Sequence, residues 1–179
     1  MIAKKVFLPL LLIVALAATA TDKPRVNRDT LKTVEKSLDT RLAGIWTDFS
    51  TVELGFTRGM YLQGYGAVFT AEISLIVAPV TMMHPTYTKQ EVVMYRKKKM
   101  DKIPVLKDAM CKALAASAAS LDPVPDNEQI VIGIFLPHYD WEDVTDLPSE
   151  ITFTAQKKKL LDAQRTGGNL QAAVEIQEN

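Results

Sequence analysis

Apolar residues at helical spacing predict the first element of the fold. From Asn27 onward they recur every three or four positions, which places them on one face of a helix. The stripe consists of Leu31, Val34, Leu38, Leu42, Ile45 and Phe49. We expect Asn27 to cap this helix, and Trp46, at the edge of the stripe, to anchor it in the core.

After a break at residues 50–55 the apolar period changes to two, which is typical of strands. Two such runs, 56–62 and 69–77, are joined through Gly64 and Gly66. This pattern predicts an antiparallel hairpin with one buried face, in which the two glycines adopt positive φ or form a bulge. Replacing Gly66 with valine should then strain the backbone by about 1–3 kcal/mol.

A second helix is predicted to begin at Thr88, which forms a capping box with Glu91. The apolar, alanine-rich pattern continues as far as Leu121. Pro104 lies inside this pattern and predicts a kink or a short break just before it, because proline lacks the amide proton that the helix needs.

The C-terminal half contains a run, 129–136, that is apolar on both faces, as is typical of a central strand covered on both sides. An acidic loop, 137–148, follows it. The remaining pattern predicts a strand, a short helix, and a tail that is an edge strand or frayed coil: 151–155, 156–165 and 170–177.

This order of elements predicts an α+β domain over residues 28–179. We expect a mostly antiparallel or mixed sheet of four to five strands with the helices packed on one face. Strand order and direction stay open, since they depend on how the strands on either side of the long helix pair. Residues 21–27 are predicted to be a flexible linker.

The first residues have the pattern of a secretory signal. Lys4 and Lys5 precede an apolar run, 6–20, that ends in a small-x-small cleavage pattern at 18–20. The run is shorter than the roughly 20 apolar residues that span a bilayer, so we expect a cleaved signal peptide over 1–20 rather than a retained anchor. The product is expected to be soluble, periplasmic or secreted, with no membrane span after cleavage.

Charge and cysteine content exclude several classes of protein. The chain has 21 basic and 21 acidic side chains and stays close to neutral when Lys4 and Lys5 leave with the signal, which argues against a nucleic-acid binder. Cys111 is the only cysteine, so an internal disulfide and a cysteine-rich metal site are excluded. Its alanine-rich helical setting predicts a buried, inert thiol.

Two histidines with neighbouring carboxylates are the sharpest chemical candidates. His84 follows Met82 and Met83, and His138 opens an acidic segment. If folding brings the two loops together, they offer ligands suited to copper, zinc or manganese. The predicted metal ligands are His84, His138, Asp140 and Glu142. The acidic segment lacks the spacing and glycine of a calcium loop.

No catalytic or nucleotide-binding motif occurs in the sequence, and no cofactor is expected. The pattern predicts an exported, non-enzymatic interaction or structural module of the cell envelope or extracellular space, whose partner is another envelope protein. One alternative is a metal-dependent or other hydrolase with a site around His84 and His138. Another is a polyanion-binding module using the runs 96–99, with Lys102, and 157–159, although the balanced charge favours solvated helix faces.

Overall fold

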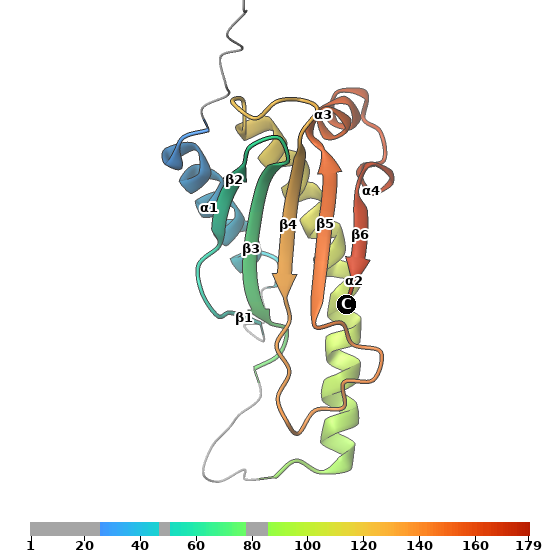
Figure 1. The fold of residues 1–179 in the computed structure, drawn as a ribbon. Helices are drawn as coiled ribbons and strands as arrows, with labels where there is room; N and C mark the ends of the chain where they lie inside the picture. Colours follow the sequence, from blue (N-terminus) through green and yellow to red (C-terminus); the bar gives the residue numbers. More distant parts are fainter. Residues whose placement is uncertain (1–25, 47–50, 78–85) are drawn as a thin grey trace, which may run out of the picture.

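The computed structural model describes residues 26–46, 51–77 and 86–179, which form a six-stranded sheet and four helices (Figure 1). The helices are α1 (Arg28–Ala43), α2 (Lys89–Ser120), α3 (Lys157–Thr166) and α4 (Leu170–Ala173). The strands are β1 (Val52–Glu53), β2 (Arg58–Leu62), β3 (Gly66–Ser74), β4 (Gln129–Phe135), β5 (Glu150–Gln156) and β6 (Glu175–Glu178). In this part of the chain no helix is long and apolar enough to cross a membrane. The predicted signal peptide, 1–20, lies outside the described residues, as does the predicted linker up to residue 25.

The sheet is mixed, with the strand order β1-β3-β4-β5-β6. Strands β1 and β2 both run antiparallel to β3, one after the other along its length. Strands β3 and β4 are parallel, whereas β5 and β6 continue the sheet in antiparallel fashion. The α+β class is confirmed. Of the two alternatives for the tail, the edge strand is present only as β6, and α4, which precedes it, was not predicted. The expected number of strands is too low, because β1 is a two-residue strand with no pattern of its own.

Helix α2 makes the connection that lets β3 and β4 run parallel. Its 32 residues, at 1.5 Å each, give a length of about 48 Å. The nine residues of β3 span about 30 Å. The N-terminal half of α2 therefore extends beyond the sheet, where the loop between β4 and β5 lies beside it (Figure 1).

Of the kink or short break predicted before Pro104, the break is wrong, because α2 is continuous from Lys89 to Ser120, and the kink stays a prediction. Pro104 removes one backbone hydrogen bond, which usually costs about 3 kcal/mol in a helix interior. Its side chain is exposed, whereas its neighbour Ile103 and Leu106 in the same turn are buried. Burial of apolar side chains on both sides of the proline, at about 1.5–3 kcal/mol each, offsets the lost hydrogen bond.

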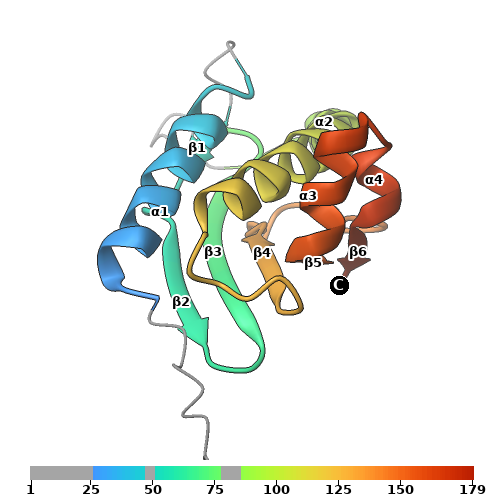
Figure 2. The ribbon, with the colours of Figure 1, turned by 90° about the horizontal axis from the view of Figure 1, so that it is seen from above.

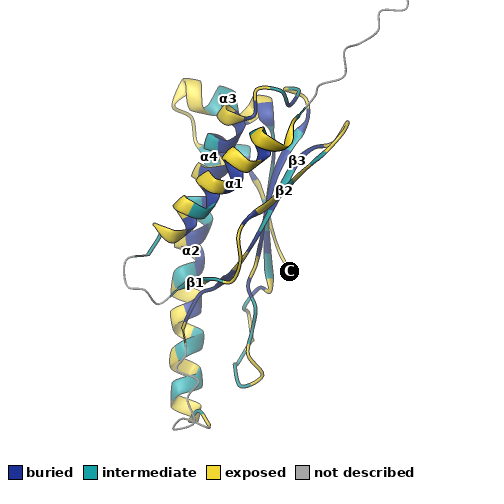
Figure 3. Ribbon diagram, turned by 90° about the vertical axis from the view of Figure 1, so that its left-hand side faces the viewer, coloured by how far each residue is buried: buried dark blue, intermediate teal, exposed yellow. Residues whose placement is uncertain are grey.

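The helices cover one face of the sheet, and the hydrophobic core lies between them (Figures 2 and 3). Alternate strand residues such as Phe69, Ile132 and Phe153 are fully buried on that face. Cys111 on α2 is buried as expected, and burial raises the pKa of its thiol.

Among the described residues, no helix lies on the opposite face of the sheet (Figure 3). β4 is a central strand with residues 130–134 buried, as predicted, but in the described part of the chain helices cover only one of its faces. Val131 is buried on this face among its cross-strand partners Val68 and Thr154, but Phe135 is 44% exposed. The strand is apolar on both faces although only one of them packs on helices.

The predicted hairpin is confirmed, with β2 paired antiparallel to β3. Gly64 and Gly66 have φ of 81° and 141°, which L-residues with side chains rarely adopt. The carboxylate of Glu128 accepts hydrogen bonds from the Gly64 amide at 3.0 Å and the Tyr61 hydroxyl at 3.2 Å. These contacts tie the turn to the segment that enters β4.

Helix α1 begins at its predicted cap, where Asn27 accepts from the amide of Thr30. Its side chains also bond the outer edge of β2. The Gly59 amide donates to Glu35 at 2.6 Å, and the Gly59 carbonyl accepts from Arg28 at 2.9 Å. Strand edges with unpaired backbone groups invite aggregation, so these bonds protect this part of the sheet.

Candidate functional site

A bulge separates β1 from β2 at the open face of the sheet. Glu53 is paired with Ile73 and Arg58 with Thr70, so residues 54–57 lie opposite only residues 71 and 72. The surplus residues cannot all continue the ladder, and bulges of this kind re-aim side chains near functional sites. Phe56 in the bulge is 75% exposed, the most exposed of the large apolar side chains in the described residues.

The bulge borders a hollow of about 270 Å³. Phe56 lines it from the bulge and Phe135 from the end of β4. Arg58, Thr70 and Glu72 also contribute to its wall. The hollow thus joins two exposed phenylalanines to one cationic and one anionic side chain.

Arg58 and Glu72 have no ion pair with any residue in the described part of the chain. Both lie at the open face of the sheet, because Arg58 is opposite Thr70 and Glu72 is two residues further along β3. A bound molecule can therefore contact both charges at this hollow without breaking an existing ion pair.

On the open face, the side chains of β2 are apolar and those of β5 are polar. Met60 and Leu62 of β2 are 55% and 45% exposed, and Met60 lies opposite Val68. Towards the far edge, β5 presents Thr152 and Thr154 instead. The apolar part adjoins the hollow, so the two make one continuous surface over β2, β3 and β4.

Two carboxyl groups lie under the bulge, on the side that faces α1. Asp39 of α1 accepts a hydrogen bond from the Thr57 amide at 2.8 Å. Near it, the Oε1 atom of Glu53 is buried with no partner in the described residues. Burial, followed by the nearby Asp39 carboxyl, raises the pKa of Glu53 from 4.5 to about 7.

The structure brings together two of the four predicted metal ligands. Nδ1 of His138 lies 3.4 Å from Oε2 of Glu142. Asp140 is exposed, and His84 lies outside the described residues. Where the structure describes the chain, no group of three or more His, Cys, Asp or Glu side chains is placed to hold a metal ion.

The cation beside His138 and Glu142 is Lys99, from the half of α2 that projects beyond the sheet. Its ammonium forms an ion pair with Glu142 and lies 3.4 Å from Nδ1 of His138. The side chains of Lys99 and Glu142 are only 3% and 4% exposed. The ammonium occupies the side of Oε2 and Nδ1, whereas Oε1 of Glu142 and Nε2 of His138 are buried with no partner in the described residues.

The acidic loop is held against α2 by further contacts. Arg96 donates to the carbonyl of Thr145 at 2.8 Å and to Asp146 at 2.9 Å. The ring of Trp141 stacks on Tyr87 with centroids 3.9 Å apart, and Tyr95 packs edge-on against it. These contacts give the loop a structural role in ordering the projecting half of α2.

The two lysine runs lie at opposite ends of the molecule, one on the lower half of α2 and the other on α3 (Figure 1). Several of the charged side chains in these runs form contacts within the protein. Arg96 pairs with Asp146, Lys99 is buried, and Lys157 donates to the carbonyl of Val124 at 2.7 Å. The structure does not bring the two runs into one patch. Polyanion binding therefore stays a prediction only for each run by itself.

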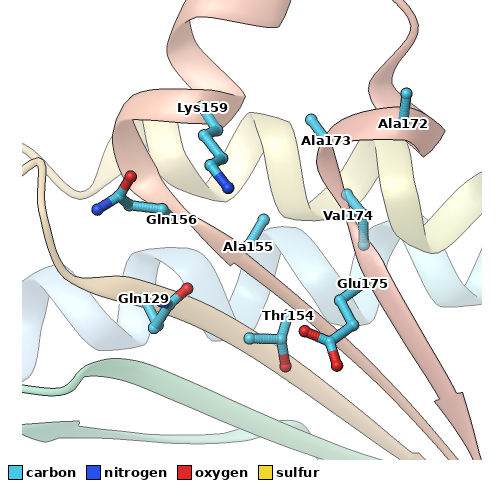
Figure 4. Close-up of a pocket in the computed structure, with 9 residues that line it drawn as sticks. All are labelled: Gln129, Thr154, Ala155, Gln156, Lys159, Ala172, Ala173, Val174 and Glu175. Carbon is cyan, nitrogen blue, oxygen red and sulfur yellow. The ribbon is translucent and has the colours of Figure 1, made fainter.

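A second hollow, of about 390 Å³, lies where β5 leads into α3 and α4 leads into β6 (Figure 4). Lys159 reaches it from α3 and Glu175 from β6, and Gln129 and Thr154 lie beneath them. Its lining contains no aromatic side chain. Because solvated polar groups gain only about 0.5–1.5 kcal/mol per new hydrogen bond, this hollow offers less binding energy than the exposed phenylalanines do.

The pattern of the sequence did not reveal the hollow beside the bulge. Phe56 looks like one more residue of an alternating strand, and Phe135 like part of a buried one. The available signal was the irregular stretch 50–55, which shows where regular pairing fails. No family model, curated protein or solved structure matches the chain.

Proposed function

We propose that the protein is an exported, non-enzymatic interaction module that binds a partner protein on the open face of its sheet. The observation that supports this proposal is the 75% exposure of Phe56 on a bulge next to Phe135. Fully burying one such side chain contributes about 1.5–3 kcal/mol. Two of them at one hollow are an unused source of binding energy, which a partner gains by covering them.

The size and shape of the hollow favour a protein over a small ligand. Its volume of about 270 Å³ is below the range of roughly 300–1,000 Å³ that is typical of small-molecule pockets. It accommodates a single apolar side chain, and the surrounding surface with Met60 and Leu62 extends the contact. The partner chemistry that fits is an apolar side chain flanked by an acidic group for Arg58 and a basic group for Glu72.

The lining of the hollow also bears on catalysis. It contains one arginine, one threonine and one glutamate among its described residues, and no histidine, cysteine or lysine. General-base and nucleophilic mechanisms need an activated base or nucleophile within hydrogen-bond reach. This composition supports binding rather than turnover. Export rests on the predicted signal at 1–20, and it makes another envelope protein the expected partner.

Site-specific photocrosslinking in intact cells tests the proposal. With a photoreactive residue in place of Phe56, we expect one discrete protein adduct. The matched control position is Lys36, which is exposed on α1 at the covered side of the sheet, and it should give none. Adding Phe135→Ala, which removes the other wall of the hollow, should lower the yield from position 56 several-fold.

The proposal is overturned if crosslinking from position 56 is absent or is not specific to that position. If position 56 yields no adduct, or the same adducts as position 36, the open face is not a binding surface. Because both positions are exposed, neither replacement should alter the thermal unfolding of the protein. Unfolding curves of both variants check that a negative result is not due to misfolding.

The alternative of a metal-dependent hydrolase is tested by titrating zinc and copper into metal-free protein. We expect no binding heat in the micromolar range, because the Lys99 ammonium already lies against Glu142 and His138. Micromolar binding that disappears in His138→Ala would support the hydrolase alternative instead. Binding that persists in this variant would indicate ligands elsewhere.

A further inference from the structure

The second hollow, beside α3 and α4, lies where the sheet loses a strand. The pairing of β5 with β6 ends at Thr154 and Glu175, so Gln156 at the end of β5 extends beyond it. At the other end of this ladder, Glu150 and Asn179 exchange backbone hydrogen bonds. In an antiparallel ladder every second residue directs its backbone groups to the same neighbour. The amide of Gln156 is therefore directed towards the side of β6, where the ladder has no residue left to accept from it.

Charged side chains of both signs lie on either side of this strand edge (Figure 4). Lys159 points from α3 towards the strands, and Glu175 lies across the hollow at the start of β6. Neither side chain has an ion pair with a residue in the described part of the chain. Oε1 of Glu175 accepts from the Gln177 side chain at 2.7 Å, so the carboxylate keeps its second oxygen for a bound molecule.

We propose that this hollow binds a small zwitterion, a free amino acid or a short peptide. The carboxylate of the ligand accepts from Lys159 and from the Gln156 amide, and its ammonium donates to Glu175. Hydrogen bonds between charged partners are shorter and stronger than neutral ones. The opposed charges also select against other ligands, because a polyanion would meet Glu175 and a metal cation would meet Lys159.

The size and lining of the hollow favour a short ligand. Its volume of about 390 Å³ lies near the lower end of the range of roughly 300–1,000 Å³ that is typical of small-molecule sites. The apolar part of the lining consists of small side chains: Ala155, Ala172, Ala173 and Val174. No aromatic ring in this lining can stack on a ligand. The two charged ends of the ligand therefore contribute most of the affinity.

An amide-resolved NMR titration with glycine, diglycine and triglycine tests the site, because these zwitterions differ in the separation of their charges. We expect saturable shifts of the amide signals around the hollow, in the millimolar range, with at least one of the three. Acetate and methylammonium each carry only one of the two charges and should bind about tenfold more weakly. Tightest binding of glycine would identify a free amino acid as the ligand, and tightest binding of diglycine or triglycine a peptide.

Three substitutions assign the binding to this hollow. Lys159→Gln and Glu175→Gln should each weaken the tightest ligand by about tenfold. The matched control is Lys158→Gln, which removes an exposed charge on the same helix outside the lining and should leave the affinity unchanged. All three positions are exposed, so the variants should unfold at the same temperature as the unaltered protein.

The proposal is overturned if none of the three zwitterions gives a saturable shift, or if acetate binds as tightly as they do. An equal loss of affinity in Lys158→Gln would also overturn it, because general surface charge would then explain the binding.

This site and the partner surface can fail separately. Gln129 lines this hollow and Phe135 the one beside the bulge, at opposite ends of β4 and about 20 Å apart along the strand. Zwitterion binding without crosslinking from position 56 would reject the partner surface alone. Crosslinking without zwitterion binding would reject this site alone.

Discussion

Replacing Glu142 with leucine is expected to lower the free energy of unfolding by about 3–5 kcal/mol. The substitution leaves the ammonium of Lys99 in a site where its side chain is only 3% exposed, with no carboxylate to balance its charge. The nearest remaining polar groups are the carbonyl of Pro137 at 3.3 Å and Nδ1 of His138 at 3.4 Å. Neither carries a negative charge, so the cost of the buried cation is largely uncompensated. Urea unfolding at pH 7 measures the loss.

The companion variant separates charge from packing. In Lys99→Met with Glu142→Leu, both charges are replaced by apolar groups, and stability should return close to that of the unaltered protein. Lys112→Met is the matched control on the same helix. It removes an exposed ion pair with Asp108, for which about 1 kcal/mol or less is expected. Equal losses in the single and double variants would show that packing, not the unpaired charge, dominates.

The Lys99 site shows that the burial and pairing of charged residues could not be predicted from the local sequence pattern. The run 96–99 looks like a solvated helix face, yet Lys99 is buried and Arg96 is bonded to the acidic loop. The pairing with Glu142 joins residues 43 positions apart, so no local pattern reports it. By contrast, His138 and Glu142 are four residues apart, and the structure does bring these two predicted ligands together.

Elements specified by nearby residues were predicted well. The cap at Asn27, the capping box of Thr88 with Glu91, and the positive φ of the turn glycines are all confirmed. Each depends on contacts within a few residues. The parallel pairing of β3 with β4 depends on how a 32-residue helix packs, and it could not be read from periodicity.

The candidate site was missed for the same reason. Its hollow combines Phe56, Arg58 and Glu72 with Phe135, which comes from a strand far along the chain. Period-two alternation indicates which residues share a face, but not whether a helix covers that face. All four helices of the described residues lie on the other side of the sheet, which no period-two pattern reports (Figure 3).

Replacing Gly66 with alanine should destabilise the protein by about 2–6 kcal/mol. The φ of 141° disfavours any side chain, by about 1–3 kcal/mol. In addition, a Cβ at this position would lie 1.8 Å from the carbonyl oxygen of Gln129. That contact is with backbone, so the first residue of β4 would have to shift, which adds a cost of about 1–3 kcal/mol. Thermal and urea unfolding measure the total.

Gly64 supplies the matched control for Gly66. Its φ of 81° is also unfavourable for a side chain, but a Cβ there would meet no atom within 4 Å. Gly64→Ala therefore carries only the backbone strain of about 1–3 kcal/mol, and the difference between the two variants isolates the close approach to Gln129. The Gln129 amide donates to the Tyr65 carbonyl at 2.7 Å, so this approach is where β4 joins the hairpin. Equal losses in the two variants would mean that β4 can move away from Gly66 at no cost, and that the parallel pairing does not depend on the glycine.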